Sequence, residues 1–250
     1  MLRGDFHHHV DADAVDGRFI RHSIGELIDR AAALDINVLA VTCHEGIPYD
    51  DSAVRYAAAK DILLLRGMEA TVAGAHMLLL NFREFPRGIC TMEEIAACKD
   101  AGALVIAPHP FYPTGVAGGE LLRTHRDVVD AIEFSGMYTP MTPHFNRHAQ
   151  RFARQAQLPV VGNSDTHFLW QPGRTYTLID APADTDSILA AIRHGRVRLV
   201  TRPLTWRHVM RFLYESQSGV SLFRDAAQYM AKVVRRTRRA ERRIVSAALE

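Results

Sequence analysis

Residues of the types that commonly bind metal ions recur in this sequence at the ends of apolar segments that are typical of β-strands. They form the motifs His7-His8-His9, His44-Glu45, Glu69, His109 and Asp165-Thr166-His167, and His76 begins a further run. Side chains at the carboxyl ends of parallel strands meet at one mouth of an α/β barrel. The pattern therefore predicts a barrel whose mouth holds a site for several metal ions.

The order of the expected elements supports the same fold class. Short apolar runs alternate with segments whose apolar residues recur at helical spacing, which is typical of α/β proteins with mostly parallel strands. Two pairs, Ser23 with Glu26 and Thr91 with Glu94, have the spacing of capping boxes that begin helices. We expect strands at residues 2–9, 37–42, 62–65, 76–82, 104–107, 131–134 and 160–161, and helices at residues 24–34, 91–101, 145–157 and 186–194.

The composition of the sequence indicates the cellular compartment in which we expect the protein. The chain has 250 residues, three cysteines and a formal net charge of +2. So few cysteines indicate a reducing compartment, and no apolar run reaches the roughly 20 residues that span a membrane. Since Met1 is not followed by the apolar stretch of a secretory signal, we expect a cytoplasmic protein without a membrane partner.

A change of composition near Pro203 divides the sequence into two predicted parts. Residues 1–205 hold all the motifs, whereas residues 206–250 form a basic, helical extension that includes the segment 235–243 (RRTRRAERR). A solvated helix is the simpler interpretation of this extension. Binding to nucleic acid is the alternative, and it predicts an affinity that falls steeply with salt.

The types of residue in the motifs suit divalent metal ions. Side chains alternate between the two faces of a strand, so His7 and His9 are expected on one face and His8 on the other. The carboxylate of Glu69 can bridge two cations. Histidine and carboxylate ligands together suit Zn²⁺, Mn²⁺ and Fe²⁺, so the metal is one of these three.

Taken in order, the motifs resemble those of the PHP (polymerase and histidinol phosphatase) family over residues 1–205. The D-L-H-x-H opening of the family matches residues 5–9 (DFHHH), and its acidic ligand beside a glycine matches Asp16-Gly17. Its T-D-H motif matches Thr42-Cys43-His44, where Cys43 stands in place of the aspartate. Later motifs match Gly67-Met68-Glu69, residues 76–80 (HMLLL), His109-Pro110, residues 162–167 (GNSDTH) and residues 188–197 (ILAAIRHGRV).

The resemblance implies a distorted (β/α)7 barrel of the TIM type with two to three divalent ions of zinc, manganese or iron. It also implies catalytic roles for Asp165, His167 and Glu69. Because Cys43 replaces a carboxylate, the support of His44 is an open question, and a thiolate ligand at this position is an alternative. By analogy, one ion takes His7, His9, Glu69 and Asp165, a second shares Glu69 and takes His76 and His109, and a third takes Asp16, His44 and His167.

The function implied is that of a metal-dependent phosphoesterase, which hydrolyses a small phosphorylated metabolite or nucleotide with a hydroxide bridged between metals. Arg174, soon after the last metal motif, and Arg18, beside Asp16-Gly17, are candidates for binding the substrate phosphate, and a plain surface position is the alternative for both. Two other functions stay open at this point. One is a nuclease acting on DNA or RNA ends, and the other is a catalytically inactive domain that binds metal for structural reasons.

Overall fold

The computed structural model of the chain describes residues 1–86 and 90–217. The chain divides into two compact units, Met1–Thr205 and Trp206–Glu250. The described part of the second unit is one helix, α7 (Trp206–Gln217), so the basic segment 235–243 lies outside the described residues. Over the described range, no helix is both long and apolar enough to cross a membrane.

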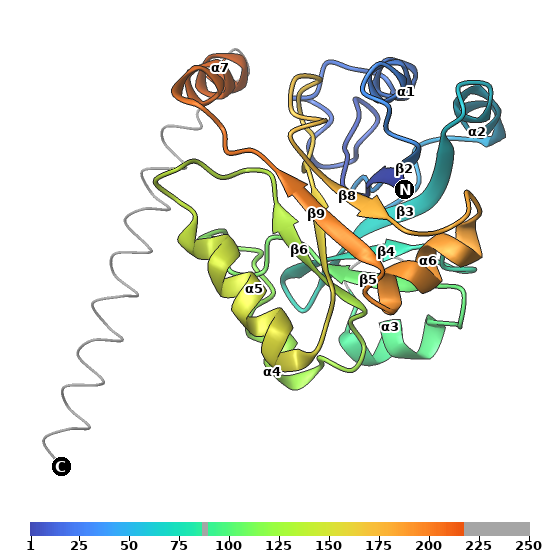
Figure 1. The fold of residues 1–250 in the computed structure, drawn as a ribbon, viewed down its shortest axis with the longest axis vertical. Helices are drawn as coiled ribbons and strands as arrows, with labels where there is room; N and C mark the ends of the chain where they lie inside the picture. Colours follow the sequence, from blue (N-terminus) through green and yellow to red (C-terminus); the bar gives the residue numbers. More distant parts are fainter. Residues whose placement is uncertain (87–89, 218–250) are drawn as a thin grey trace, which may run out of the picture. The chain divides into compact units, whose positions relative to one another are not determined.

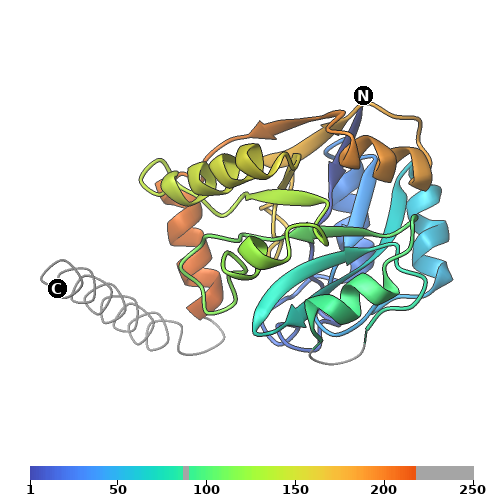
Figure 2. The same ribbon diagram turned by 90° about the horizontal axis from the view of Figure 1, so that it is seen from below.

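Strands and helices alternate through much of the first unit, and the helices lie around the outside of the strands (Figures 1 and 2). The strands are β1 (Leu2–Asp5), β2 (Val38–Val41), β3 (Leu63–Val72), β4 (Ala75–Leu80), β5 (Leu104–Ala107), β6 (Ala131–Ser135), β7 (Val160–Asn163), β8 (Thr175–Ile179) and β9 (Val197–Thr201). The helices are α1 (Ile24–Ala32), α2 (Asp51–Ala58), α3 (Met92–Cys98), α4 (Leu121–Thr124), α5 (His144–Ala156) and α6 (Thr185–Arg193).

All these strands belong to one sheet, in the order β7-β6-β5-β4-β3-β2-β1-β8-β9. The sheet curls into a nearly closed barrel, because β7 also lies against β8 and β9. The Thr177 hydroxyl accepts from Gly162 N at 2.9 Å and donates to Gly162 O at 3.1 Å. Beyond the strand ends, His9 N donates to Thr166 O at 2.9 Å. The predicted α/β barrel is therefore confirmed.

The expectation of mostly parallel strands holds for only part of the barrel. In the described chain β1, β2 and β3 pair in parallel, as do β5, β6 and β7, whereas β4, β8 and β9 run antiparallel to the strands they pair with. The reversal at β4 follows from a two-residue turn, Ala73-Gly74, with φ of 48° and 83°. Positive φ at both positions is typical of tight hairpins.

Apolar residues fill the barrel and the layer under the helices. One core cluster joins side chains of β2 to β8, including Leu78 and Ile106, to Ile188 and Ile192 of α6. A second packs α1 and α2 against β2 and β3, and a third packs α3 and α5 against the β3–β6 side. Burial of these apolar side chains supplies the main favourable contribution to folding. Most of the polar residues of the motifs lie on loops that follow the strands.

Several predicted boundaries differ from the structure. Both capping boxes are confirmed, at Ser23 for α1 and Thr91 for α3, although α3 ends at Cys98. The first strand ends at Asp5, well before His9, and β3 continues to Val72 instead of ending near residue 65. Four elements were not predicted, namely α2, α4, β8 and β9.

Candidate metal centre

The nine predicted metal ligands come together in the first unit, most of them on segments that follow a strand. Glu69 is an exception, because it lies inside β3, which runs past the end of its parallel pairing with β2. Asp16 lies in the loop before α1. The other ligands follow or begin strands: His7 and His9 after β1, His44 after β2, His76 in β4, His109 after β5, and Asp165 and His167 after β7.

The first predicted group surrounds one small space. Oε2 of Glu69 lies 3.3 Å from His7 Nε2 and 3.2 Å from His9 Nε2. Oδ1 of Asp165 lies 3.5 Å and 3.7 Å from the same two nitrogens. Two imidazoles and two carboxylates thus each turn one donor atom toward a common point.

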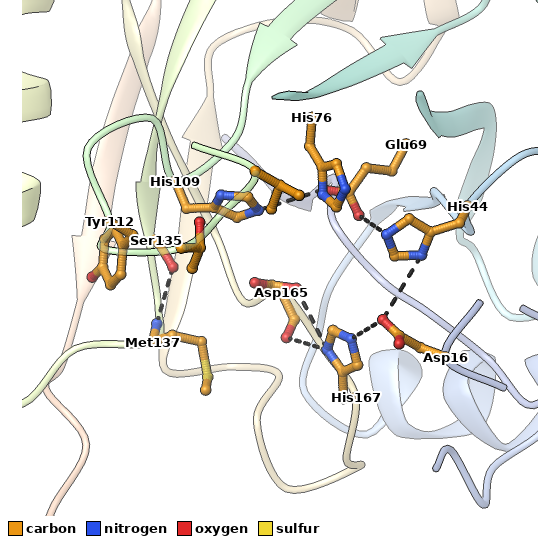
Figure 3. A pocket seen from close by; sticks show the side chains of 12 residues that line it. Asp16, His44, Glu69, His76, His109, Tyr112, Ser135, Met137, Asp165 and His167 are labelled. Carbon is orange, nitrogen blue, oxygen red and sulfur yellow. Dashed lines mark hydrogen bonds and ion pairs between the residues drawn. The ribbon is translucent and has the colours of Figure 1, made fainter. Parts of the chain in front are cut away.

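The second oxygen of Glu69 faces a different pair of histidines. Oε1 lies 2.8 Å from His76 Nδ1 and 3.4 Å from His109 Nε2. The side chain of Glu69 is 2% exposed, and Figure 3 shows it beside the rings of His76 and His44. A carboxylate that divides its oxygens in this way is placed to bridge two cations.

The third group is centred on Asp16. Its Oδ2 lies 3.3 Å from His167 Nε2 and 3.9 Å from His44 Nδ1, and Figure 3 shows it between the two rings. His44 is also tied to the first group, because its Nε2 lies 3.2 Å from Glu69 Oε2. The three groups therefore form one continuous cluster.

Two buried carboxylates outside the predicted set stand behind the ligand histidines. Oε2 of Glu133, in β6, lies 3.1 Å from His7 Nδ1, and Oδ2 of Asp13 lies 2.8 Å from His9 Nδ1. The sequence contained a signal for this role of Glu133, because it is a charged residue within the apolar run 131–134, and a buried charge needs a partner. Asp13 gave no such signal, since it lies in a loop close to other aspartates.

Two of the predicted ligands have strained backbones. His109 has φ of 29° and Asp165 has φ of 53°, in a region that residues other than glycine rarely adopt. In the sequence, His109 also lies between two prolines, Pro108 and Pro110. Strain of this kind persists where the surrounding structure holds it in place, and it concentrates at functional sites.

Burial and neighbouring charges oppose each other in setting the pKa values of the cluster. Burial lowers the pKa of His7, but the carboxylates of Asp165 and Glu69 outweigh burial and raise that pKa well above its usual value. For His167, burial is likewise outweighed, mainly by Asp16, and the pKa rises to about 9. Burial raises the pKa of Glu69, yet the charge on His7 helps to hold that pKa below its usual range. Protons and metal ions bind at the same donor atoms of these side chains, so the two compete for them.

Two residues that neighbour predicted ligands in the sequence, His8 and Cys43, lie in the protein interior. His8 lies with its Nδ1 3.0 Å from Ala40 O and its Nε2 3.2 Å from Asp5 Oδ2, so it faces away from the ligands, as predicted. Cys43 is 1% exposed within the core cluster under α1 and α2. Burial raises the pKa of its thiol, which opposes the thiolate that a metal ligand requires.

The two arginines predicted to bind substrate make other contacts. Arg174 donates through its guanidinium to Pro203 O. The guanidinium of the exposed Arg18 lies 4.4 Å from the centre of the Phe19 ring. Neither residue lines the cavity beside the ligands, so their roles in binding substrate stay predictions.

A cavity of about 320 Å³ opens beside the ligand cluster. One side carries seven of the predicted metal ligands, and the other is a neutral wall formed by the loop after β5 and by residues at and just after the end of β6 (Figure 3). In the described chain no lysine or arginine lines this cavity. The lining residues are Asp16, His44, Glu69, His76, His109, Asp165 and His167 on the first side, and Tyr112, Thr114, Val116, Ser135 and Met137 on the second.

The donor set fits divalent metal ions. Nε2 of His9 and Oε1 of Glu69 are buried and make no hydrogen bond within the described residues, although each lies close to other ligand atoms. Donor atoms of His7, His9 and Glu69 lie within 4.8 Å of one another, as do those of His44, Glu69 and His76. Such imidazole and carboxylate donors match the preferences of zinc, manganese and iron.

Known proteins share this fold. Residues 143–197 match a family model described as PHP-associated, and no curated protein matches the sequence. PsfC from Pseudomonas syringae has a TM-score of 0.63 and 16% identity, with 87% of this chain and 99% of PsfC covered. A protein from Bifidobacterium adolescentis assigned as a metal-dependent phosphoesterase has a TM-score of 0.54 and 16% identity, with coverage of 88% and 97%.

An amidohydrolase from Chromobacterium violaceum, solved with bound sulfate and no metal, has a TM-score of 0.55 and 16% identity, with 83% of this chain and 96% of that chain covered. At this level of identity the three structures show a common barrel fold. Together with the family model and the ordered motifs, they confirm the resemblance of this chain to the PHP family.

Proposed function

We propose that this protein is a metal-dependent hydrolase that cleaves phosphate esters of small metabolites. The observation that carries the proposal is the divided carboxylate of Glu69, whose Oε2 faces His7 and His9 while its Oε1 faces His76 and His109. A carboxylate between two histidine sets is placed to bridge two ions of a multinuclear hydrolytic centre.

The ligand groups described above would hold two to three divalent ions of zinc, manganese or iron. When bound, such ions lower the pKa of water and neutralise the charge of phosphate oxygens. Asp16 is the most exposed carboxylate of the set, at 28%, and with His44 and His167 it would complete the third site.

The residues of the chain have separate tasks in this scheme. Glu69 holds the two histidine sets together. Asp165 and His167 lie side by side at the cavity, with Asp165 Oδ1 3.5 Å from His167 Nδ1. Burial raises the pKa of Asp165, but the charges on His7 and His167 outweigh burial and lower that pKa, so His167 would pass the proton to the leaving oxygen while Asp165 stays ionised beside it. The neutral wall with Tyr112 and Ser135 would receive the alcohol part of the ester.

The alternatives have less support. The nuclease function rests on the basic segment 235–243, which lies outside the described residues. An inactive structural domain is opposed by a ligand cluster in which all nine predicted side chains are close together. Comparing hydrolysis of a mononucleotide with that of a short oligonucleotide separates the phosphatase from the nuclease.

Replacing the bridging carboxylate tests the proposal. We expect Glu69→Gln to bind fewer metal ions than the wild-type protein and to lose phosphoesterase activity by about 100-fold or more, since several kcal/mol of charge stabilisation depend on the ions. Metal content is measured by elemental analysis, and activity with a chromogenic phosphate monoester and diester in the presence of Mn²⁺.

The matched control is Glu84→Gln, which makes the same chemical change at an exposed glutamate. It should keep the metal content and the rate of the wild-type protein. A Glu69→Gln protein with full metal content and an unchanged rate would show that the proposed scheme is wrong.

A further inference from the structure

We propose that Asp13 is a positioning residue of the metal centre, whose buried carboxylate holds the Nδ1 atoms of His9 and His44 so that Nε2 of each ring is aimed at Glu69. This inference rests on the metal-dependent function proposed above. It adds to the site a residue that is not among the nine predicted ligands.

The contacts with the two rings carry the first step. Asp13 Oδ2 lies 2.8 Å from His9 Nδ1, and both oxygens of Asp13 lie 3.2 Å from His44 Nδ1. An ionised carboxylate only accepts hydrogen bonds, so each Nδ1 carries the hydrogen, and a ring in its neutral form then has a lone pair on Nε2 for a metal ion. Both Nε2 atoms lie 3.2 Å from Glu69 Oε2, so the two nitrogens and this oxygen would be available to bind the same metal ion.

The same carboxylate also organises the backbone of two ligands. Oδ1 accepts from Val15 N at 2.8 Å and from Asp16 N at 2.9 Å, and Oδ2 accepts from His44 N at 2.9 Å. Asp13 therefore shapes the turn that presents Asp16 to His167. It also ties that turn to the segment after β2, so one side chain links members of the first and third groups.

The N–H groups around Asp13 fill the acceptor sites of its carboxylate, which indicates a positioning role and not a ligand role. Five N–H groups face Asp13, three from the backbone and two from imidazoles, whereas a carboxylate offers about four lone-pair sites. The side chain is fully buried. Its donor atoms do lie within 4.8 Å of those of His9 and His44, but a cation there would approach backbone N–H groups, which carry partial positive charge.

The neighbour of His44 in sequence cannot take over this task. Cys43 lies in the core, and a thiol is only a weak hydrogen-bond acceptor. The carboxylate beside His44 comes instead from Asp13, 31 residues earlier in the chain. Carboxylates that orient ligand histidines typically change metal affinity about 10–100-fold when they are removed.

Zinc titration of the chelator-treated protein tests the proposal, with a chromogenic chelator as competitor. We expect Asp13→Asn to bind as many ions at saturation as the wild-type protein, with at least one affinity weakened about 10–100-fold, because the amide NH₂ opposes the imidazole N–H groups. In the zinc-loaded variant kcat should fall while KM stays close to the wild-type value. Asp11→Asn, at an exposed aspartate of the same loop, should match the wild-type protein.

Each other outcome has a clear meaning. An Asp13→Asn affinity within twofold of the wild-type value would overturn the positioning role, and the loss of one whole equivalent of zinc would make Asp13 a ligand. Wild-type protein that binds no zinc, manganese or iron would overturn the proposed function itself. If Asp13→Asn does not fold, ¹⁵N spectra of histidine in the zinc-loaded wild-type protein decide, because hydrogen on Nε2 of His9 or His44 would contradict the inference.

Discussion

At the scale of single residues, His7 and His9 each have a carboxylate close to both ring nitrogens. Their Nε2 atoms lie 3.3 Å and 3.2 Å from Glu69 Oε2, and their Nδ1 atoms lie 3.1 Å from Glu133 and 2.8 Å from Asp13. The contact at each Nδ1 restricts rotation of the ring, so the Nε2 donor atoms are oriented without the help of a metal ion. Binding then loses little side-chain entropy, which is the benefit of a preorganised site.

Cysteine reactivity provides a prediction at this scale. In the folded protein we expect iodoacetamide to modify the exposed Cys98 and to leave Cys43 unmodified, because Cys43 is buried and its raised pKa suppresses the reactive thiolate. Mass spectrometry of peptides after timed labelling measures both sites. Cys43 should react once the protein is unfolded in urea, and labelling of Cys43 as fast as Cys98 in the native state would contradict its place in the core.

At the scale of elements, the β3–β4 hairpin matters most to the site. It carries Glu69 on one strand and His76 on the other, and their contact of 2.8 Å depends on the register Glu69↔Leu78 and Thr71↔His76. The Ala73-Gly74 turn sets this register, since a two-residue loop allows no slippage. The extended length of β3 therefore matters for the candidate site, because it brings the carboxylate of Glu69 to the histidines.

Substitutions in the hairpin turn should change stability in opposite directions. Gly74→Ala adds a Cβ that meets no atom within 4 Å, so its cost of about 1–2 kcal/mol comes from the positive φ alone. Ala73→Asn creates the Asn-Gly pair that such turns favour and should raise the free energy of unfolding. Urea denaturation measures both values. Equal stability of the two variants would contradict the assigned turn.

At the scale of the whole first unit, barrel closure connects the two ends of the sheet. The Thr177 hydroxyl in β8 exchanges two hydrogen bonds with the backbone of Gly162 in β7. The adjoining segment 163–166 contacts the segment after β1 through bonds such as Thr166 N to His7 O at 3.1 Å. Closure thus places Asp165 beside His7 and His9, although more than 150 residues separate them in sequence.

A substitution at the closure should weaken the fold. Thr177→Val keeps the shape of the side chain but leaves the Gly162 N–H and C=O buried without this partner, so we expect the free energy of unfolding to fall by about 1–3 kcal/mol. Thr177→Ser keeps the hydroxyl and should stay closer to the wild-type value. Chemical denaturation of the three proteins, followed by circular dichroism, provides the comparison. A valine variant as stable as the wild-type protein would show that these bonds do not hold the barrel closed.

Local patterns predicted the parts of the protein whose determinants are close in sequence. The capping boxes at Ser23 and Thr91 are confirmed because their partners lie three residues away. Buried strands such as β2 and β5 were found from their apolar runs, which need no distant partner to be visible. In contrast, β8 and β9 were missed, since a half-buried antiparallel strand becomes regular only through its pairing with neighbours.

The sequence by itself determined which kinds of side chain are available, their order, and the barrel that brings them together. Only the tertiary structure decided how each donor atom is used: which oxygen of Glu69 faces which histidines, and that Asp13 and Glu133 stand behind the rings. The physical reason is that hydrogen bonds and metal ligation depend on distances of a few ångström between segments far apart in the chain. Those distances are set by strand register, barrel closure and packing, which no local pattern contains.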